Sequence, residues 1–281
     1  MSKINPFANF DKVYLFVGQR VVFGAYYLWL LFYPNPHCMQ RELDNWYSPN
    51  LQKHTEIAVY GHYGFGLLMI PTAASDYLEY ERQHLIDSIS KYIDGGKVKV
   101  FCVNSINTES WMNPHMSGHA KGIRHQQFNE YIYNEVVPYI KSQTSPETPI
   151  IAAGASFGAL HSANLFFRRP HLINGVIAMS GCYDLTAYTK GHYDDNVYFN
   201  SPVHYLRNLH DEAYLSKYRA SKHIHLLSGS GSYEDPDASR LLSSILHSKS
   251  IPHELDIWGH DIPHDWPTWH KMLPYYLESR F

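Results

Sequence analysis

The stretch Gly154-Ala155-Ser156-Phe157-Gly158 carries a serine in the pattern G-x-S-x-G. The pattern is short and occurs by chance, but its setting is informative. Residues 149–153 (PIIAA) predict a buried strand, and residues 156–167 predict an apolar helix. A strand, a tight turn and a helix are the context that presents a nucleophilic serine. The turn would lift the Ser156 hydroxyl to the helix N-terminus, where the N–H of Phe157 faces a developing oxyanion. An ordinary glycine-rich turn is the alternative.

A serine hydroxyl needs a base to become a nucleophile. In this setting the expected chain order is serine, acid, histidine. The last loop, residues 259–266, contains both His260 and His264. We expect His264 to be the base, because it directly precedes the closing helix, where Trp266 and Trp269 can pack behind its ring. His260 is the alternative.

The acid that orients the histidine should follow the predicted strand before the last one. Residues 228–237 form that loop and contain Glu234, Asp235 and Asp237. We favour Glu234, with Asp235 as the alternative acid. Asp235 and Asp237 flank a proline, and either could cap the next helix. Asp184, in the preceding loop, is a further option.

A second oxyanion donor should be a backbone N–H in the loop at residues 71–75, which follows the apolar run 66–70. The small side chains of this loop would let a substrate approach the backbone. We expect Ala73 to donate, with Ala74 as the alternative. An ordinary turn would have the same composition.

Short apolar runs alternate with helical patterns along the rest of the chain. The runs predict strands at 55–60, 66–70, 97–103, 149–153, 174–180, 223–227 and 252–258, and the periodic stretches predict helices at 77–92, 126–141, 156–167, 236–247 and 264–279. This alternation indicates the α/β class, with a mostly parallel central sheet and helices on both faces. In such sheets the chemistry lies at the carboxyl ends of the strands.

The composition excludes several classes of protein. The chain has 281 residues, 44% of them hydrophobic and 17% charged, which suits one large globular domain. A net charge of -3 provides no basic excess for nucleic acid. Three cysteines without a C-x-x-C pair form no disulfide framework or zinc motif. The 19 histidines are scattered along the chain, so no metal site is predicted.

The N-terminal part differs in composition from the rest. Residues 13–33 are strongly apolar but are broken by Gln19 and Arg20, and a membrane-spanning helix needs about 20 apolar residues. We interpret residues 1–38 as a hydrophobic extension: an anchor, a helix lying on the domain, or a non-native start before Met39. Residues 39–281 are then the catalytic domain. A cytoplasmic location is expected, with membrane anchoring through residues 13–33 or export as alternatives.

Several segments together resemble a bacterial branch of the putative-esterase family of α/β hydrolases, which is related to feruloyl, acetyl-sugar and formyl-glutathione esterases. The segments are Trp46–Leu51, Pro71–Glu81, Gly154–Gly158, Gly229–Pro236 and Trp258–Trp269. The resemblance covers about residues 40–281. It implies the α/β-hydrolase fold, no dissociable cofactor and no metal, and its H-D-W-x-x-W stretch favours His264. Related esterases often carry the acid in a G-x-x-D stretch, whereas here Gly-Ser-Gly-Ser is followed by Glu234 and Asp235, which leaves the acid open.

These observations predict a serine hydrolase that cleaves a small-molecule carboxylic ester through an acyl-enzyme intermediate. Residues 180–202, rich in Tyr, Asp and Asn, and residues 104–119, which include Trp111, are the candidate walls of the substrate pocket. Such walls suit a polar or aromatic acyl ester better than a long lipid. The alternative is a catalytically inactive hydrolase fold that serves as a binding or scaffold protein, because a fold does not by itself imply a function.

Overall fold

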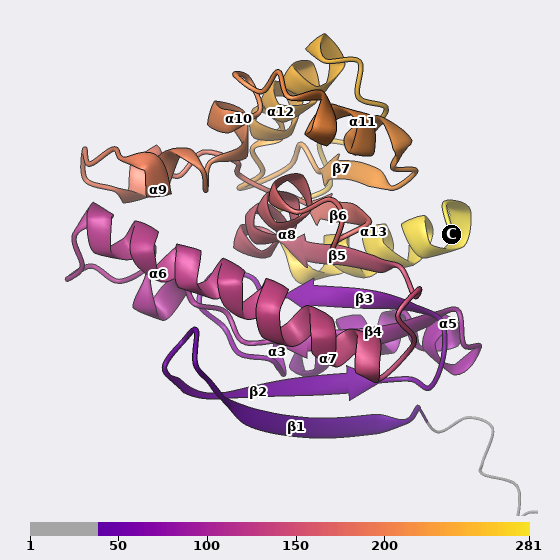
Figure 1. The fold of residues 1–281 in the computed structure, drawn as a ribbon. Helices are drawn as coiled ribbons and strands as arrows, with labels where there is room; N and C mark the ends of the chain where they lie inside the picture. Colours follow the sequence, from indigo (N-terminus) through magenta and orange to yellow (C-terminus); the bar gives the residue numbers. More distant parts are fainter. Residues whose placement is uncertain (1–38) are drawn as a thin grey trace, which may run out of the picture. The chain divides into compact units, whose positions relative to one another are not determined.

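Eight strands form a single sheet in the order β1-β2-β4-β3-β5-β6-β7-β8 (Figure 1). The computed structural model describes residues 39–281. β1 pairs with β2 and β2 with β4 in antiparallel fashion, and the other neighbours are parallel, so the prediction of a mostly parallel sheet is confirmed. The strands are β1 (Arg41–Ser48), β2 (Lys53–Tyr60), β3 (Phe65–Ile70), β4 (Val98–Val103), β5 (Ile150–Ala155), β6 (Gly175–Met179), β7 (Ile224–Ser228) and β8 (Glu254–Ile257).

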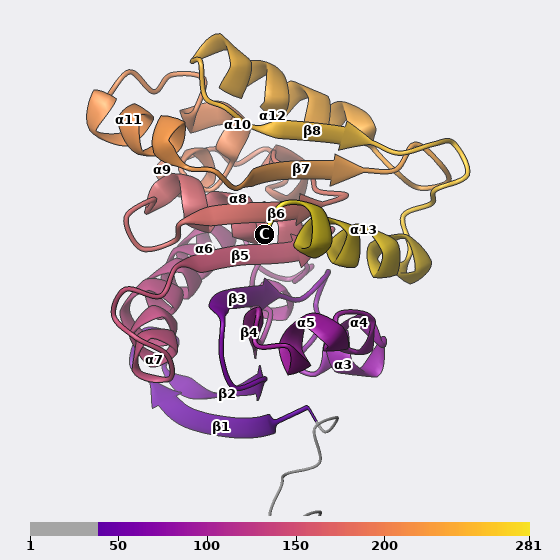
Figure 2. The same cartoon turned by 90° about the vertical axis from the view of Figure 1, so that its right-hand side faces the viewer.

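Helices cover both faces of the sheet (Figure 2). One face carries α6 (Gly118–Tyr131), α7 (Val137–Ser142), α8 (Phe157–Arg168), α10 (Pro202–Tyr205), α11 (Glu212–Ala220) and α12 (Pro236–Ser248). The opposite face carries α3 (Glu79–Arg82), α4 (Leu85–Ser88), α5 (Ser90–Asp94) and α13 (Trp266–Ser279). The short α9 (Asp195–Tyr198) lies in the segment between β6 and β7 and contacts α6.

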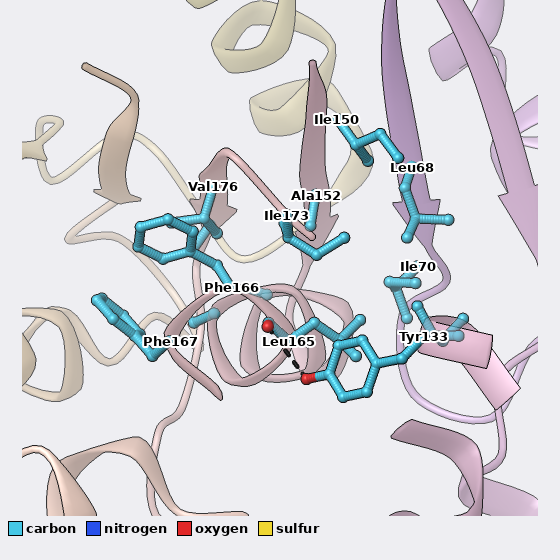
Figure 3. Packing of buried hydrophobic residues seen from close by; sticks show 14 of the residues in the cluster. Leu68, Ile70, Tyr133, Ile150, Ala152, Leu165, Phe166, Phe167, Ile173 and Val176 are labelled. Carbon is cyan, nitrogen blue, oxygen red and sulfur yellow. Dashed lines mark hydrogen bonds between the residues drawn. The ribbon is translucent and has the colours of Figure 1, made fainter. Parts of the chain in front are cut away.

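The central strands are buried on both sides, which explains their unbroken apolar sequences. Successive residues of β5 point to opposite faces: Ile150 and Ala152 enter one core cluster, and Ile151 and Ala153 enter the other. Figure 3 shows the first of these clusters, where the side chains of α8 pack under β3, β5 and β6.

β1 was not predicted from the sequence. Its residues, RELDNWYS, are mostly exposed and polar, so no period-2 alternation marks them as a strand. β1 is an edge strand, held by pairing along its whole length with β2, from Arg41 opposite Tyr60 to Ser48 opposite Lys53.

The single helix predicted at 77–92 is wrong. The segment forms three short helices, and His84 adopts a left-handed conformation with φ 59° between the first two. The helix predicted at 126–141 starts earlier, at Gly118, and passes through a π-helical turn at Ile132–Val136 before α7. Pro138, which has no N–H to give to the helix, lies just beyond that turn.

No helix among residues 39–281 is long and apolar enough to cross a membrane. The extension interpreted at residues 1–38, with its apolar segment at 13–33, lies outside the described residues.

Two glycines allow α8 to start directly against the ends of β3 and β5. A methyl group on Gly158 would lie 2.2 Å from the carbonyl oxygen of Ile70, and one on Gly154 would lie 2.5 Å from the Gly158 carbonyl carbon. Both distances are far below van der Waals contact, so neither position admits a side chain. The glycines of the G-x-S-x-G pattern therefore fix how closely helix and sheet approach.

Gly158→Ala is expected to destabilise the fold by about 1–3 kcal/mol or more, because its methyl group must displace the backbone of β3. Urea unfolding would measure the loss. Ser162→Ala is the matched control on the same helix: its buried hydroxyl has no hydrogen-bond partner within residues 39–281, so removing it should leave stability unchanged or raised. A Gly158→Ala midpoint equal to that of the wild type would contradict the close approach.

Candidate active site

Ser156 occupies the turn between β5 and α8 in a strained conformation. Its φ of 58° and ψ of -122° belong to a region that non-glycine residues rarely adopt. The backbone N–H of Ser156 donates to the Met179 carbonyl (2.9 Å), which ties the turn to β6. Within residues 39–281 the Ser156 hydroxyl makes no hydrogen bond, and the residue is partly exposed. The turn thus leaves the hydroxyl partly exposed at the carboxyl end of β5, where the sequence predicts a nucleophile.

Some backbone N–H groups around Ser156 donate hydrogen bonds, and others do not. Phe157 is the first residue of α8, so its N–H has no partner within the helix. β3 lies next to β5, which brings the loop at 71–75 beside this N-terminus. In that loop the N–H of Thr72 donates to the Glu79 carboxylate (2.7 Å) and is not available. The N–H groups of Ala73 and Ala74 make no hydrogen bond in the part of the chain that is described.

Glu234 and His264 lie together beyond the carboxyl ends of β7 and β8, on the side of the sheet where Ser156 follows β5. His264 Nδ1 lies 3.3 Å from Glu234 Oε2; the Glu234 side chain is fully buried, and that of His264 is 25% exposed. The carboxylate also accepts hydrogen bonds from Ser180 Oγ (2.6 Å), Ser228 Oγ (3.2 Å) and the N–H of Gly229 (3.1 Å). Burial acts to raise the pKa of Glu234, but the donors from His264, Ser180 and Gly229 outweigh it and hold this pKa below its ordinary value.

The other candidate acids and the alternative histidine lie elsewhere. Asp235 is exposed at the N-terminus of α12, and its side chain makes no capping hydrogen bond. Asp237 pairs with Arg240, and Asp184 accepts from Thr186 and pairs with His204. The ring of His260 is exposed. Among the described residues, His264 has Glu234 as its carboxylate partner.

The Gly-Ser-Gly-Ser stretch at 229–232 holds the histidine loop in place. The N–H of Gly231 donates to the Ile262 carbonyl (3.0 Å), and a methyl group on Gly229 would lie 2.1 Å from that same oxygen. The N–H of His264 donates to the Ser232 carbonyl (2.9 Å). The departure from the family's G-x-x-D pattern thus coincides with a backbone contact between the two loops that carry Glu234 and His264.

Ser180 and Tyr80 were not singled out from the sequence. Ser180 has φ 54° at the end of β6; it donates to Glu234 and accepts from Trp269 Nε1 (3.0 Å), while the Trp269 ring meets His264 edge-on at 5.2 Å. The Tyr80 hydroxyl donates to the Ile70 carbonyl (2.6 Å) and accepts from the Ala155 N–H (3.1 Å). It therefore bridges the ends of β3 and β5 immediately before Ser156. No local sequence pattern marks either residue, because each acts through partners 10 to 89 positions away.

A buried chain of hydrogen bonds ends on the Ala73 carbonyl. Trp111 Nε1 donates to His125 Nδ1 (2.9 Å), His125 Nε2 lies 3.0 Å from His161 Nδ1, and His161 Nε2 lies 3.0 Å from Asn107 Oδ1. The Asn107 amide then donates to the Ala73 carbonyl (2.5 Å).

The direction of this chain follows from its first member. An indole nitrogen can only donate, so His125 must accept at Nδ1 and donate from Nε2, and the same order passes through His161 to Asn107. The first three links are buried, and the last, to the partly exposed Ala73, is partly buried. Burial lowers the pKa of His161 to about 3 and the pKa of His125 well below its ordinary value, which keeps both rings neutral as the chain requires.

Comparison with known proteins shows the family and the fold of the chain. Residues 75–278 match the family model described as "Putative esterase". The chain belongs to the putative esterase family. As a member it is a carboxylic-ester hydrolase. A search of curated protein sequences found no match to this chain.

Solved structures show the same fold. A ferulic acid esterase superposes with a TM-score of 0.65 at 18% identity, over 85% of this chain and 96% of that one. An S-formylglutathione hydrolase from Agrobacterium tumefaciens gives 0.64 at 10% identity, over 87% and 97%. A ferulic acid esterase from Anaeromyces mucronatus gives 0.61 at 12% identity, over 88% and 96%. The esterase thus has the α/β-hydrolase fold along nearly the full length of these proteins.

The lowered pKa of Glu234 predicts a pH-dependent contribution to stability. The folded state favours the carboxylate, so this contribution is complete above the ordinary glutamate pKa of 4.5 and is lost as the pH falls through the lower folded value. Glu234→Gln should therefore be less stable than the wild type at pH 7, and the gap should narrow on acidification. Urea unfolding across this range tests it, with the exposed Glu147→Gln as control. A gap that stays constant with pH would contradict the assignment.

The buried chain predicts an effect of Asn107→Ala on turnover. Without its amide donor the Ala73 carbonyl is less firmly oriented, so kcat for a chromogenic short-chain ester should fall, at most by the 10²–10³-fold that losing an oxyanion donor typically costs. If Ala73 is the oxyanion donor that the sequence predicts, KM should change little, because such a donor acts on the transition state. Asn113→Ala, whose side chain binds the Thr108 carbonyl at the surface, is the matched control. Unchanged kcat in Asn107→Ala would show that the chain does not act on catalysis.

Proposed function

We propose that this esterase forms a covalent acyl-enzyme on Ser156, with His264 as general base and Glu234 as the carboxylate that orients it. The proposal rests above all on one observation. The fully buried Glu234 carboxylate faces His264 at the sheet edge where Ser156 is held in a strained turn. The chain order of serine, acid and histidine is that of the α/β hydrolases.

The reaction proceeds in two balanced halves. Ser156 Oγ attacks the ester carbonyl carbon while His264 Nε2 takes its proton, and the carbonyl electrons move onto oxygen. Collapse of this tetrahedral oxyanion breaks the bond to the alcohol, which leaves with the proton from His264. A water then attacks the acyl-Ser156 carbonyl, giving its proton to His264. The second collapse releases the acid and returns the proton to Ser156.

Two backbone N–H groups would stabilise the oxyanion. Phe157 supplies one, at the positive end of the α8 dipole. Ala73 supplies the other, and Ala74 is the alternative. Two observations support this loop: the Thr72 N–H is already committed to Glu79, and the Ala73 carbonyl is anchored by Ser105 Oγ and Asn107.

Glu234 has a positioning role in this scheme. It accepts from His264 Nδ1–H, which leaves Nε2 unprotonated and able to take the serine proton. The distance of 3.3 Å is long for a charge-assisted hydrogen bond, and such bonds often tighten only once substrate binds. Ser180 and Trp269 support the pair from behind, one through the carboxylate and the other against the imidazole ring.

The segment between β6 and β7 supports a small polar or aromatic acyl ester as substrate. Its Tyr188 packs edge-on against the Phe157 ring at 4.9 Å, and this contact supports an aromatic wall near the proposed oxyanion donor. Trp111, expected in the second wall, is instead 2% exposed and belongs to the core beneath Phe157. The names of two similar structures, both ferulic acid esterases, point to the same substrate class.

Labelling with a fluorophosphonate probe tests the proposal. The wild type should react, Ser156→Ala should not, and His264→Ala should react more slowly by several orders of magnitude, because the serine has lost its base. Gel fluorescence over time gives the rates. Glu234→Gln should also be slower, by on the order of 10³–10⁴, because the histidine tautomer is no longer fixed.

Matched controls lie in the same loops. Ser232→Ala and His260→Ala remove exposed side chains next to the site and should label like the wild type. Asp235→Asn should also label normally. Equal labelling of wild type and Ser156→Ala would refute Ser156 as nucleophile. A folded wild type that does not label and does not cleave an ester panel would support the inactive binding or scaffold protein.

A further inference from the structure

Two histidines and an aspartate converge away from Ser156, at the surface between α6 and α9. His119 Nδ1 lies 2.7 Å from Asp194 Oδ2, and His192 Nε2 lies 2.9 Å from the same oxygen. All three atoms are within 4.8 Å of one another. His119 comes from the first turn of α6, while His192 and Asp194 come from the segment between β6 and β7.

The backbone of this cluster is fixed by close packing. A methyl group on Gly118 would lie 2.5 Å from the Thr189 carbonyl oxygen and 2.7 Å from His192 Cβ, and one on Gly122 would lie 2.8 Å from Asn196 Cβ. Two glycines one helical turn apart thus allow the segment to lie directly on α6. Asp194 Oδ1 caps α9 by accepting from the Val197 N–H (3.0 Å), which leaves Oδ2 directed at the histidines.

One nitrogen in the cluster has no partner that satisfies it. His192 Nε2 is buried and makes no hydrogen bond among the described residues. It is close to the Asp194 carboxylate, but their geometry is not that of a hydrogen bond, so proximity alone does not satisfy it. Buried polar atoms are nearly always paired, and an unpaired one calls for an explanation. An ion that accepts the imidazole lone pair while facing the carboxylate would provide it.

We propose that His119, His192 and Asp194 bind one divalent transition-metal ion of the zinc class, with a fourth position open to water. Two imidazoles and one carboxylate suit Zn²⁺, whereas Mg²⁺ and Ca²⁺ prefer oxygen ligands alone. Tetrahedral ligands about 2.0–2.1 Å from zinc lie about 3.3 Å apart. The two nitrogen–oxygen distances, 2.7 and 2.9 Å, would therefore each lengthen by about half an ångström around the ion.

The ion would fasten a wall of the active-site region to α6. Tyr188 belongs to the segment that carries His192 and Asp194, and it contacts Phe157 beside the nucleophile. Lys190 and Gly191, between these residues, are exposed, and a methyl group on Gly191 would meet no atom of the described residues within 4 Å apart from its chain neighbours. The ion would therefore add a further link to a surface segment that already packs on Gly118 and Gly122 and accepts a hydrogen bond from Lys121 at the Tyr188 carbonyl.

Zinc titration of the full-length, chelator-treated protein against a chromogenic zinc chelator tests the proposal. One tight equivalent per chain is expected. His119→Ala and His192→Ala should each weaken it by more than about 100-fold, since losing even a residue that supports a ligand costs 10–100-fold. Asp194→Asn should weaken binding while keeping the Oδ1 cap of α9. His84→Ala, which removes another surface histidine paired with an aspartate, should bind like the wild type.

Trypsin cleavage after Lys190 gives a second readout that does not depend on activity. Zinc should slow this cleavage in the wild type and in Ser156→Ala, but not in His119→Ala. His119 is 59% exposed, so its replacement should leave the fold intact, which circular dichroism would verify. The proposal is overturned if the folded wild type takes up no stoichiometric zinc, or if His119→Ala and His192→Ala bind as tightly as the wild type. Because Ser156→Ala should still bind zinc, this result is independent of the proposed catalytic role.

Discussion

The approach of α8 to the ends of β3 and β5 is the constraint on which the rest of the site depends. With no room for a side chain at Gly154 or Gly158, the chain must reverse direction within one residue, and Ser156 takes up the strain. Such strain costs about 1–3 kcal/mol and persists only where the surroundings enforce it. The same contact brings the loop at 71–75 beside the helix N-terminus, so the proposed nucleophile and the proposed oxyanion donors share one structural origin.

Around this contact, nearly every buried polar atom is committed to a partner. The Glu234 carboxylate takes donors from side chains and backbone, and Tyr80 occupies the two strand ends before Ser156. At the turn itself, the Ser156 hydroxyl and the N–H groups of Ala73 and Ala74 make no hydrogen bond in the described part of the chain, whereas the unpaired Ser162 hydroxyl is buried farther along α8. A preorganised site has this property, because its unpaired groups are the ones aimed at the reacting atoms.

Local patterns predicted the elements whose signal is local. Unbroken apolar runs predicted the buried parallel strands, and the G-x-S-x-G pattern predicted the turn between a strand and a helix at Ser156. β1 was not predicted because an exposed edge strand needs no alternation of apolar and polar residues. The single helix at 77–92 was predicted wrongly because the spacing of apolar residues does not reveal the left-handed backbone of His84. The order of serine, acid and histidine along the chain pointed to the loop at 228–237 for the acid. It did not decide between the adjacent residues Glu234 and Asp235. Which of them turns inward depends on Ser180 and on the packing of 229–232 against Ile262, contacts between distant parts of the chain.

The histidines also form contacts that their spacing in the sequence does not reveal. Scattered spacing predicts no metal site, yet the fold divides the histidines of α6 between two assemblies: His125 enters the buried chain to Ala73, and His119 faces Asp194. Lys121, buried between them, donates to the carbonyls of Trp111 and Tyr188 (both 3.1 Å). α6 therefore holds both the first member of the buried chain and the segment beside Phe157. An ion at His119 would act on a segment already fixed by Lys121, so its effect should be on the stiffness of that segment more than on its position.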